Sequence, residues 1–480
     1  MKLEVRNFIG GKFVDSISKT NIPVINPANQ NIVGHIDEAL DDEIDEAFSA
    51  AKKSFNQRIL QDMDASLKSK KMRSIASKLR EYKKRGAIIL SQENGKTIEQ
   101  CEGEFDGAAS VFDYYAGLTD KIENKLIPSG NDTFNYILLE PFGVSLQIVP
   151  WNYPISLFAR SVAVSLVVGN TIVIKPPELC PISSNIFGEI FNEVELPDGI
   201  LNIVHGYGEI TGKKLVDHDS INQVVFTGSP QVASEILKRT ADRIIPCHLE
   251  LGGKSAAIIF PDANIDNAVD STIKGIFKPN AGQICVAMSR VIIHPKIKDE
   301  YMTKLFEKTK NLKIGAGSDN MSEVTPLISA EQLQRVSNYC QSGVQSGAEL
   351  IIGGEKHEQE NGNYYKPTIF DNVDPKSTIA QEEIFGPVTS VFNFETAEEA
   401  IEIANATDYG LASGVFTAND EKAKWTADRI EAGIVWHNDW FVDGVNLPGG
   451  GYKKSGYGRD GGIDSLYSYG QTKRVSKRIN

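Results

Sequence analysis

The sequence is poor in cysteine, and the cysteines that occur are not paired by spacing. Five are scattered among the 480 residues: Cys101, Cys180, Cys247, Cys285 and Cys340. Their odd number and the lack of a CxxC pair argue against a disulfide framework and against a zinc site, so no metal is expected. Unpaired cysteines are usual in a reducing compartment, and we therefore predict a cytoplasmic location.

Long apolar runs and an excess of positive charge are also missing. No stretch offers about 18 uninterrupted apolar residues, so no membrane span is expected. The first six residues lack the apolar region of a signal peptide. With 50 basic and 63 acidic residues, the net charge is −13. No long basic run interrupts this acidic background, which disfavours nucleic acid as a partner.

From Gly143 onward, the sequence alternates short apolar runs with helical patterns. The predicted buried strands are 144–149, 171–174, 201–204 and 224–226, and a second alternating block contains the strands 256–260, 291–294, 350–352 and 389–392. This alternation predicts an α/β fold with parallel sheets covered on both faces. A chain of 480 residues exceeds what one hydrophobic core supports, so two or three domains are expected.

The flanking regions have different patterns. Residues 7–14 resemble a hairpin, and apolar residues at helical spacing predict helices over 41–57 and through 72–82. Residues 125–140 look extended and polar, as an arm rather than as core. The tail from Ser465 is predicted to be a short polar extended segment.

Two residues carry the chemistry of a covalent hydrolytic reaction. Cys285 follows the turn Gly282-Gln283, and Glu250 stands upstream in Glu250-Leu251-Gly252-Gly253. A thiol nucleophile and a carboxylate base are the groups that form and then hydrolyse a thioester. The alternative is that Cys285 is a small buried apolar residue, as most isolated cysteines are.

A loop bracketed by two prolines follows the strand 144–149. Its sequence is Pro150-Trp151-Asn152-Tyr153-Pro154. The amide of Asn152 is placed to donate to an oxyanion. In the alternative interpretation, Asn152 only satisfies the backbone of the turn.

Three further strand ends suit a dinucleotide. Lys175 and Glu178 are placed to bind a ribose, and Ser229 caps a helix whose free amides suit a pyrophosphate. The turn from Gly206 to Gly212 resembles a GxGxxG fingerprint, but its third glycine comes one residue late. Each signal alone also fits an ordinary charged loop, capped helix or turn.

Together these motifs resemble those of the NAD(P)-dependent aldehyde dehydrogenase superfamily. They stand in the family's order along nearly the whole chain: Trp151-Asn152-Tyr153-Pro154, Lys175-Pro176-Pro177-Glu178, Phe226-Thr227-Gly228-Ser229, Glu250-Leu251-Gly252-Gly253-Lys254, Gly282-Gln283-Ile284-Cys285, Glu382-Glu383-Ile384-Phe385-Gly386-Pro387 and Gly451-Tyr452-Lys453-Lys454-Ser455-Gly456.

The resemblance implies an α/β fold with three parts. These are a Rossmann-like NAD-binding domain (1–123 and 146–251), an α/β catalytic domain (252–455) and a small β oligomerisation arm (124–145 and 456–480). The C-terminal strand near 471–475 is expected to pair with the arm segment 125–140. A homodimer or homotetramer is the implied assembly.

The resemblance also implies the site residues. The catalytic candidates are Cys285, Glu250, Asn152 and Lys175. The cofactor candidates are Ile148, Trp151, Lys175, Glu178, Gly208, Gly228, Ser229, Val232, Leu251, Gly252, Glu383 and Phe385. A carboxylate at Glu178 would repel a 2′-phosphate, so NAD is predicted over NADP.

The implied reaction oxidises an aldehyde to a carboxylate. Cys285 attacks the carbonyl, the Asn152 amide and the Cys285 N–H hold the oxyanion, and Glu250 activates water against the resulting thioester. The alternatives are a Cys-dependent esterase or thioesterase without redox, a dehydrogenase that passes the acyl group to coenzyme A, and a binding protein that kept the fold.

The substrate prediction depends on Arg160, which follows the Asn152 loop by one to two helical turns. Its guanidinium suits the distal carboxylate of a semialdehyde, although this stretch also resembles dehydrogenases of aromatic aldehydes; the alternative is a salt bridge directed away from the substrate. Tyr153 and Ile284 are predicted beside it.

Two residues, Lys278 and Pro279, separate Phe277 from Asn280 where the common pattern has one, so a reshaped turn is expected before Cys285.

Overall fold

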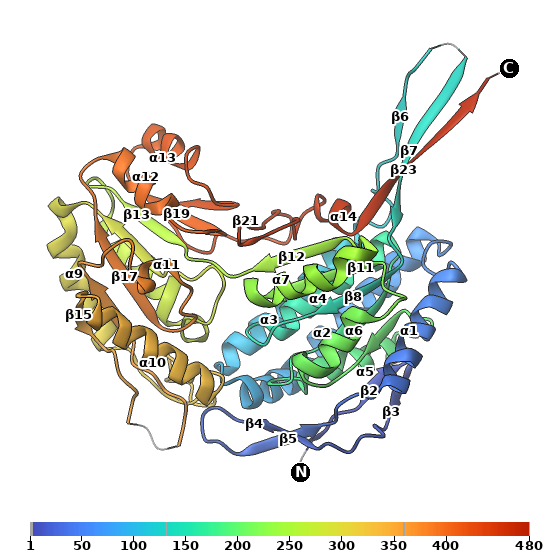
Figure 1. Cartoon of the computed structure of the whole chain (residues 1–480), viewed down its shortest axis with the longest axis horizontal. Helices are drawn as coiled ribbons and strands as arrows, with labels where there is room; N and C mark the ends of the chain where they lie inside the picture. Colours follow the sequence, from blue (N-terminus) through green and yellow to red (C-terminus); the bar gives the residue numbers. More distant parts are fainter. Residues whose placement is uncertain (1–2, 131, 359–360, 480) are drawn as a thin grey trace.

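Two α/β lobes and a projecting β-arm make up the computed structural model, which describes residues 3–130, 132–358 and 361–479 (Figure 1). The lobes are built on an eight-stranded and a seven-stranded sheet, and the arm is a three-stranded sheet. The chain passes from the first lobe to the second at the end of β12 (Cys247–Leu251). It returns late, so that β22 (Gly456–Tyr457) joins the first sheet beside β12.

The eight-stranded sheet has the order β22-β12-β11-β8-β9-β10-β2-β3. Its other strands are β2 (Asn7–Ile9), β3 (Lys12–Val14), β8 (Val144–Ile148), β9 (Thr171–Lys175), β10 (Leu201–Ile203) and β11 (Gln223–Gly228). The strands from β12 to β10 run parallel, as predicted, whereas β22 and the β2–β3 hairpin add antiparallel edges.

Helices cover this sheet on both faces. One core contains side chains of α2 (Ala65–Asn94), α3 (Ile98–Ala116), α4 (Pro154–Val168) and α5 (Ile186–Glu193). The other contains those of α1 (Asp41–Asn56), α6 (Lys213–Asp217) and α7 (Pro230–Thr240). Along β9, Ile172 and Ile174 belong to the first core and Val173 to the second, because successive strand side chains point to opposite faces.

The helix α2 extends well beyond the predicted segment 72–82. The carboxylate of Asp64 caps its start by accepting from the backbone N–H of Ser66 at 2.8 Å. Gly95 ends it in the left-handed conformation (φ 95°), which glycine adopts without steric cost. The next helix, α3, begins at Ile98 after its N-cap Thr97. Lys96 therefore lies between the end of α2 and the start of α3.

The seven-stranded sheet has the order β15-β16-β17-β14-β13-β19-β20. Its strands are β13 (Ala256–Ile259), β14 (Arg290–Ile293), β15 (Glu349–Ile352), β16 (Thr368–Asp371), β17 (Val388–Asn393), β19 (Ala412–Phe416) and β20 (Ile434–His437). Its helices are α8 (Ile265–Thr272), α9 (Pro295–Lys310), α10 (Ala330–Gln345), α11 (Thr378–Gln381), α12 (Ala397–Asn405) and α13 (Asp420–Ala427). The strands are parallel except for β15, which lies antiparallel at the edge.

The arm consists of β6 (Lys125–Ile127), β7 (Thr133–Pro141) and β23 (Gly470–Arg478), and it projects away from both lobes (Figure 1). β23 pairs antiparallel with β7 along its whole length, which confirms the predicted pairing of the tail with the arm. The prediction of an extended tail from Ser465 is wrong for its first turn, because α14 (Ser465–Ser468) precedes β23. There the hydroxyl of Ser465 donates to the carbonyl of Gly462, a local bond that favours a turn.

Smaller elements complete the fold. They are β1 (Leu3–Glu4), β4 (Ile22–Ile25) and β5 (Ile32–Ile36) in one sheet, and β18 (Tyr409–Gly410) paired with β21 (Tyr452–Lys453) in another. Within the described ranges, no helix is both long enough and apolar enough to cross a membrane.

Candidate active site

The carboxyl ends of the parallel strands bring the predicted cofactor residues to one sheet edge. Ile148 of β8 is in register with Lys175 of β9 and with Phe226 of β11, and Gly228 of β11 is in register with Leu251 of β12. Ligands of open α/β sheets bind outside this edge, where loops replace the strands. The register of the strands therefore brings the ends of these segments close together.

A charged pair occupies the end of β9. Nζ of the buried Lys175 lies 3.0 Å from Oε2 of Glu178, and Gly208 donates its backbone N–H to Oε1 at 3.3 Å. Burial alone would raise the pKa of Glu178, but Lys175 and these hydrogen bonds lower it below its usual value. Glu178 therefore presents a negative charge at the carboxyl edge of the sheet.

The start of α7 offers polar and apolar surface together. The hydroxyl of Ser229 accepts from the backbone N–H of Val232 at 3.3 Å, and Pro230 occupies the first helical position. The side chains of Val232 and Ile210 are 46% and 47% exposed. Exposed apolar side chains beside a free helix N-terminus suit a ligand with a flat base and an anionic linker.

Glu383 and Phe385 reach this edge from the second lobe. The backbone N–H of Gly253 donates to Oε1 of Glu383 at 3.0 Å, and a Cβ on Gly252 would collide with the same carboxylate. Burial raises the pKa of Glu383 to about 7. Phe385, held at φ 61°, meets Trp151 edge to face with ring centroids 5.3 Å apart. A strained non-glycine backbone of this kind is often found at a functional site.

The loop before Cys285 is tightly hydrogen-bonded. A short helical segment over Pro279–Gly282 contains left-handed residues at Asn280 (φ 47°) and Ala281 (φ 50°). The buried Gln283 accepts from the N–H of Ile328 at 3.0 Å and donates to the carbonyl of Asn280 at 2.9 Å. This turn fixes the backbone that presents Cys285.

The thiol of Cys285 is half-buried and is not ionised by its surroundings. Burial raises its pKa to about 12, while the nearby Arg160 opposes this shift and Glu383 and Glu250 add to it. The protein without ligand therefore holds a neutral thiol. Arg160, Glu383 and Glu250 thus influence the pKa of the same thiol, and the cysteine loop packs on the segment after Glu250, where a Cβ on Gly253 would collide with the carbonyl of Cys285.

The Asn152 loop is hydrogen-bonded directly to the loop that precedes Cys285. Nδ2 of Asn152 donates to the backbone carbonyl of Gln283 at 3.2 Å. Its own carbonyl accepts from Nζ of Lys96 at 2.9 Å and from Nδ2 of Asn280 at 3.1 Å. Hydrogen bonds thus join the loop of the predicted oxyanion donor to the loop of the predicted nucleophile.

The sequence did not predict the buried ion pair that contacts the Asn152 loop. Lys96 pairs with Glu104, both fully buried, and Nζ of Lys96 lies 4.4 Å from the ring centre of Tyr153. Glu104 also accepts from the N–H of Ser156 at the start of α4. No periodicity or motif marked Lys96, since an isolated lysine between two helices normally faces solvent.

Glu250 is buried at the end of β12, and its Oε1 has no hydrogen-bond partner among the described residues. Burial and, after it, Asp460 raise its pKa to about 8, although Arg160, His248 and Arg459 oppose the shift. A carboxyl group with such a pKa can both accept and release a proton near neutral pH.

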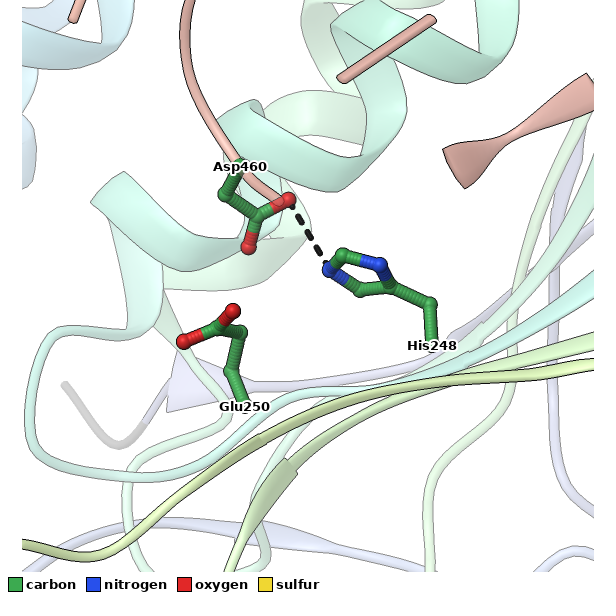
Figure 2. A group of neighbouring side chains, drawn as sticks. All are labelled: His248, Glu250 and Asp460. Carbon is green, nitrogen blue, oxygen red and sulfur yellow. Dashed lines mark ion pairs between the residues drawn. The ribbon is translucent and has the colours of Figure 1, made fainter. Parts of the chain in front are cut away.

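Arg160, the predicted substrate contact, is engaged in an ion pair. Its Nε lies 2.9 Å from Oδ2 of Asp460, a residue that the sequence reasoning did not select. The other oxygen, Oδ1, lies 3.2 Å from Nε2 of His248, so Asp460 is held between two basic side chains. Figure 2 shows His248, Glu250 and Asp460 pointing toward one another. Arg160 and Tyr153 remain half-buried and Ile284 is buried.

A comparison with known proteins bears on this geometry. The model of the aldehyde dehydrogenase family matches residues 13–475. The chain belongs to the aldehyde dehydrogenase family. It is an enzyme of the NAD(P)-dependent class, and aldehydes are the substrates of this class.

Relatives of the chain match over nearly their full length. Betaine aldehyde dehydrogenase of Bacillus subtilis is 36% identical over 98% of this chain and 96% of its own. Aminoaldehyde dehydrogenase 1 of Pisum sativum, a peroxisomal protein, is 37% identical over 98% of this chain and 95% of its own. The NAD⁺ complex of an aldehyde dehydrogenase from Bacillus cereus superposes with a TM-score of 0.97 at 37% identity, over 100% of this chain and 97% of that one.

Proposed function

We propose that this aldehyde dehydrogenase uses NAD to oxidise an aldehyde to a carboxylate, through a thiohemiacetal and then a thioester on Cys285 that is hydrolysed with Glu250 as base. The observation that carries the proposal is the packing of the Cys285 loop on the segment that follows the buried Glu250, where a Cβ on Gly253 would collide with the carbonyl of Cys285. A base beside the nucleophile serves hydrolysis, because a thioester needs an activated water.

Residues at the sheet edge fit the cofactor. Lys175 and Glu178 would bind the adenosine ribose, Ser229 and the amides of α7 the pyrophosphate, and Glu383 the nicotinamide ribose. Exposed Val232 and Ile210 offer apolar contact to the base. When bound, NAD accepts the hydride that the substrate carbon loses. The charge on Glu178 opposes a 2′-phosphate, so we propose NAD rather than NADP.

In the first half-reaction, the sulfur of Cys285 forms a bond to the aldehyde carbon as the thiol loses its proton. Arg160 favours the thiolate, and the proton of the thiol passes to water. The Asn152 amide, with the backbone N–H of Cys285, would donate to the developing oxyanion. Loss of hydride from the same carbon restores the carbonyl as a thioester.

In the second half-reaction, Glu250 takes a proton from water while the water oxygen bonds to the thioester carbon. The C–S bond then breaks, the carboxylate product leaves, and the sulfur of Cys285 is ready for the next aldehyde. The raised pKa of Glu250 makes this carboxylate a stronger base than an exposed one once it is ionised.

An aldehyde panel tests this proposal against its alternatives. We expect NADH formation with equimolar carboxylate, no requirement for coenzyme A, and loss of NADH formation in Cys285→Ala. Ester hydrolysis without NADH from any aldehyde would favour the esterase alternative. Turnover that depends on coenzyme A would favour the acylating dehydrogenase.

The substrate class depends on the ion pair of Arg160 with Asp460. The guanidinium still keeps a side-chain exposure of 30%, which supports a semialdehyde whose distal carboxylate it would meet. Relatives named for betaine aldehyde and aminoaldehydes point to cationic substrates instead, which Arg160 would repel. We expect Arg160→Ala to raise KM for succinic semialdehyde far more than for benzaldehyde. An equal effect on both aldehydes would refute the carboxylate contact.

The division of labour along the chain is part of the proposal. Residues 1–123 and 146–251 would bind NAD, 252–455 would supply the thiol, and 124–145 with 456–480 would join copies into a homodimer or homotetramer. A cytoplasmic location fits the unpaired cysteines.

A further inference from the structure

The group around Glu250 contains a histidine for which the reaction above has no role. We propose that His248, as an imidazolium that pairs with Asp460 beside Glu250, is a positioning residue that favours the ionised form of the Glu250 carboxylate, the base for thioester hydrolysis. The inference rests on the proposed function, because it assigns a partner to the base of that reaction.

The backbone places His248 and Glu250 on the same face of β12. They are two residues apart on one strand, so both side chains point to the same side of the sheet. One atom each of His248, Glu250 and Asp460 lies within 4.8 Å of the other two (Figure 2). The imidazole is fixed in place, since its ring centre is 5.2 Å from that of Tyr469 and a Cβ on Gly458 would collide with it.

The charges around the imidazole favour its protonated form. Burial alone would lower the pKa of His248, but Asp460 and then Glu250 raise it above its usual value, against a smaller effect of Arg160. The groups that face the cluster come from β12, from α4, from the segment after β22 and from the residue before β23: Glu250, Arg160, Arg459, Asp460 and Tyr469.

A charge balance shows why Glu250 needs this partner. Asp460 is committed to Arg160 at 2.9 Å, and Arg459 donates to the carbonyl of Gly458 at 2.6 Å. Ionised Glu250 thus faces the negative Asp460 in a buried site, and the imidazolium of His248, which also pairs with Asp460 at 3.2 Å, adds a positive charge beside it. Without it, ionisation of Glu250 becomes less favourable, because an unpaired buried carboxylate takes up a proton.

The experiment separates the two half-reactions. With an aldehyde that gives an NADH burst, the burst rate reports acylation and the steady rate reports thioester hydrolysis. Both are measured across the neutral and alkaline pH range for the wild type, His248→Gln and Asp460→Asn. His35→Gln, which changes a histidine on β5, is the matched control.

We expect the burst amplitude of His248→Gln to persist. The midpoint of its steady rate against pH should move about one unit toward alkaline pH, so turnover near neutral pH falls about tenfold. Asp460→Asn removes the negative neighbour of Glu250 and also the anion that favours the imidazolium, so its midpoint should move less than that of His248→Gln. A residue with a purely structural role would lower the rate evenly without moving either midpoint.

Several outcomes overturn the inference. An unmoved midpoint in His248→Gln, or a larger alkaline shift in Asp460→Asn than in His248→Gln, contradicts it even when the wild type oxidises aldehydes normally. If His248→Gln does not fold, His248→Asn is judged by the same shift. Failure of the wild type to form NADH would instead refute the proposed function.

Discussion

Buried charged side chains shape the site at the scale of single residues. Lys96 forms an ion pair with Glu104 and donates to the carbonyl of Asn152, and Arg160 forms an ion pair with Asp460. Breaking a buried pair by removing one partner is costly, on the order of 3–5 kcal/mol, because the other charge is left uncompensated. Stability and catalysis must therefore be measured separately at these positions.

We predict that Lys96→Met lowers both stability and kcat, and that Lys96→Met/Glu104→Gln recovers much of the stability but not kcat. The double variant removes both buried charges, yet the carbonyl of Asn152 keeps only the hydrogen bond from Asn280 and the oxyanion donor is less well positioned. The expected loss of kcat is on the order of 100-fold. Thermal unfolding and burst kinetics measure the two effects. Recovery of kcat together with stability would show that Lys96 serves the fold alone.

The pH dependence of wild-type hydrolysis follows from Glu250. Its raised pKa of about 8 means that the carboxyl group is mostly protonated at neutral pH and must lose its proton to act as base. We predict that the steady rate rises with pH, by about tenfold per unit below the midpoint, and levels off above it. A steady rate that is flat or falls over this range in stopped-flow and steady-state assays would argue against Glu250 as the base.

At the scale of secondary structure, we propose that the strand ends set cofactor choice. β9 ends at Lys175, and Glu178 three residues later carries a negative charge where the adenosine ribose is proposed to lie. We predict that Glu178→Gln raises kcat/KM for NADP relative to NAD by about tenfold or more, because repulsion of the 2′-phosphate is removed. Initial rates with both cofactors test this. An unchanged ratio would mean that another group selects the cofactor.

The sequence predicted the elements better than the contacts between them. Apolar runs such as 171–174 and 224–226 became strands because they are buried on both faces, and periodic spacing located α1. The positions of Cys285 and Glu250 followed from motifs. Lys96, His248 and Asp460 could not be found this way, because their burial depends on segments that meet only in the folded chain.

At the scale of the whole molecule, the arm extends away from the lobes (Figure 1) and leaves apolar side chains exposed. Leu126 and Phe134 on it are 61% and 43% exposed. Exposed apolar strands of this kind mark a contact with another chain. This supports the proposal of a homo-oligomer built through the arm.

We predict that a chain ending at Tyr469, which lacks β23, forms smaller assemblies than the full chain. Loss of β23 leaves one edge of β7 without its strand partner and disrupts the surface proposed to join the copies. Analytical ultracentrifugation compares the two. A full chain that already sediments as a monomer would refute the proposed role of the arm.

The central claim is that Cys285 carries an acyl group which Glu250 removes with water. The most direct measurement is mass spectrometry of Glu250→Gln, quenched after mixing with an aldehyde and NAD. We predict one equivalent of NADH per active site and an acyl mass on the peptide that contains Cys285, with steady turnover reduced about 100-fold to 10,000-fold. Absence of the acyl mass on Cys285, with turnover intact, would contradict the account.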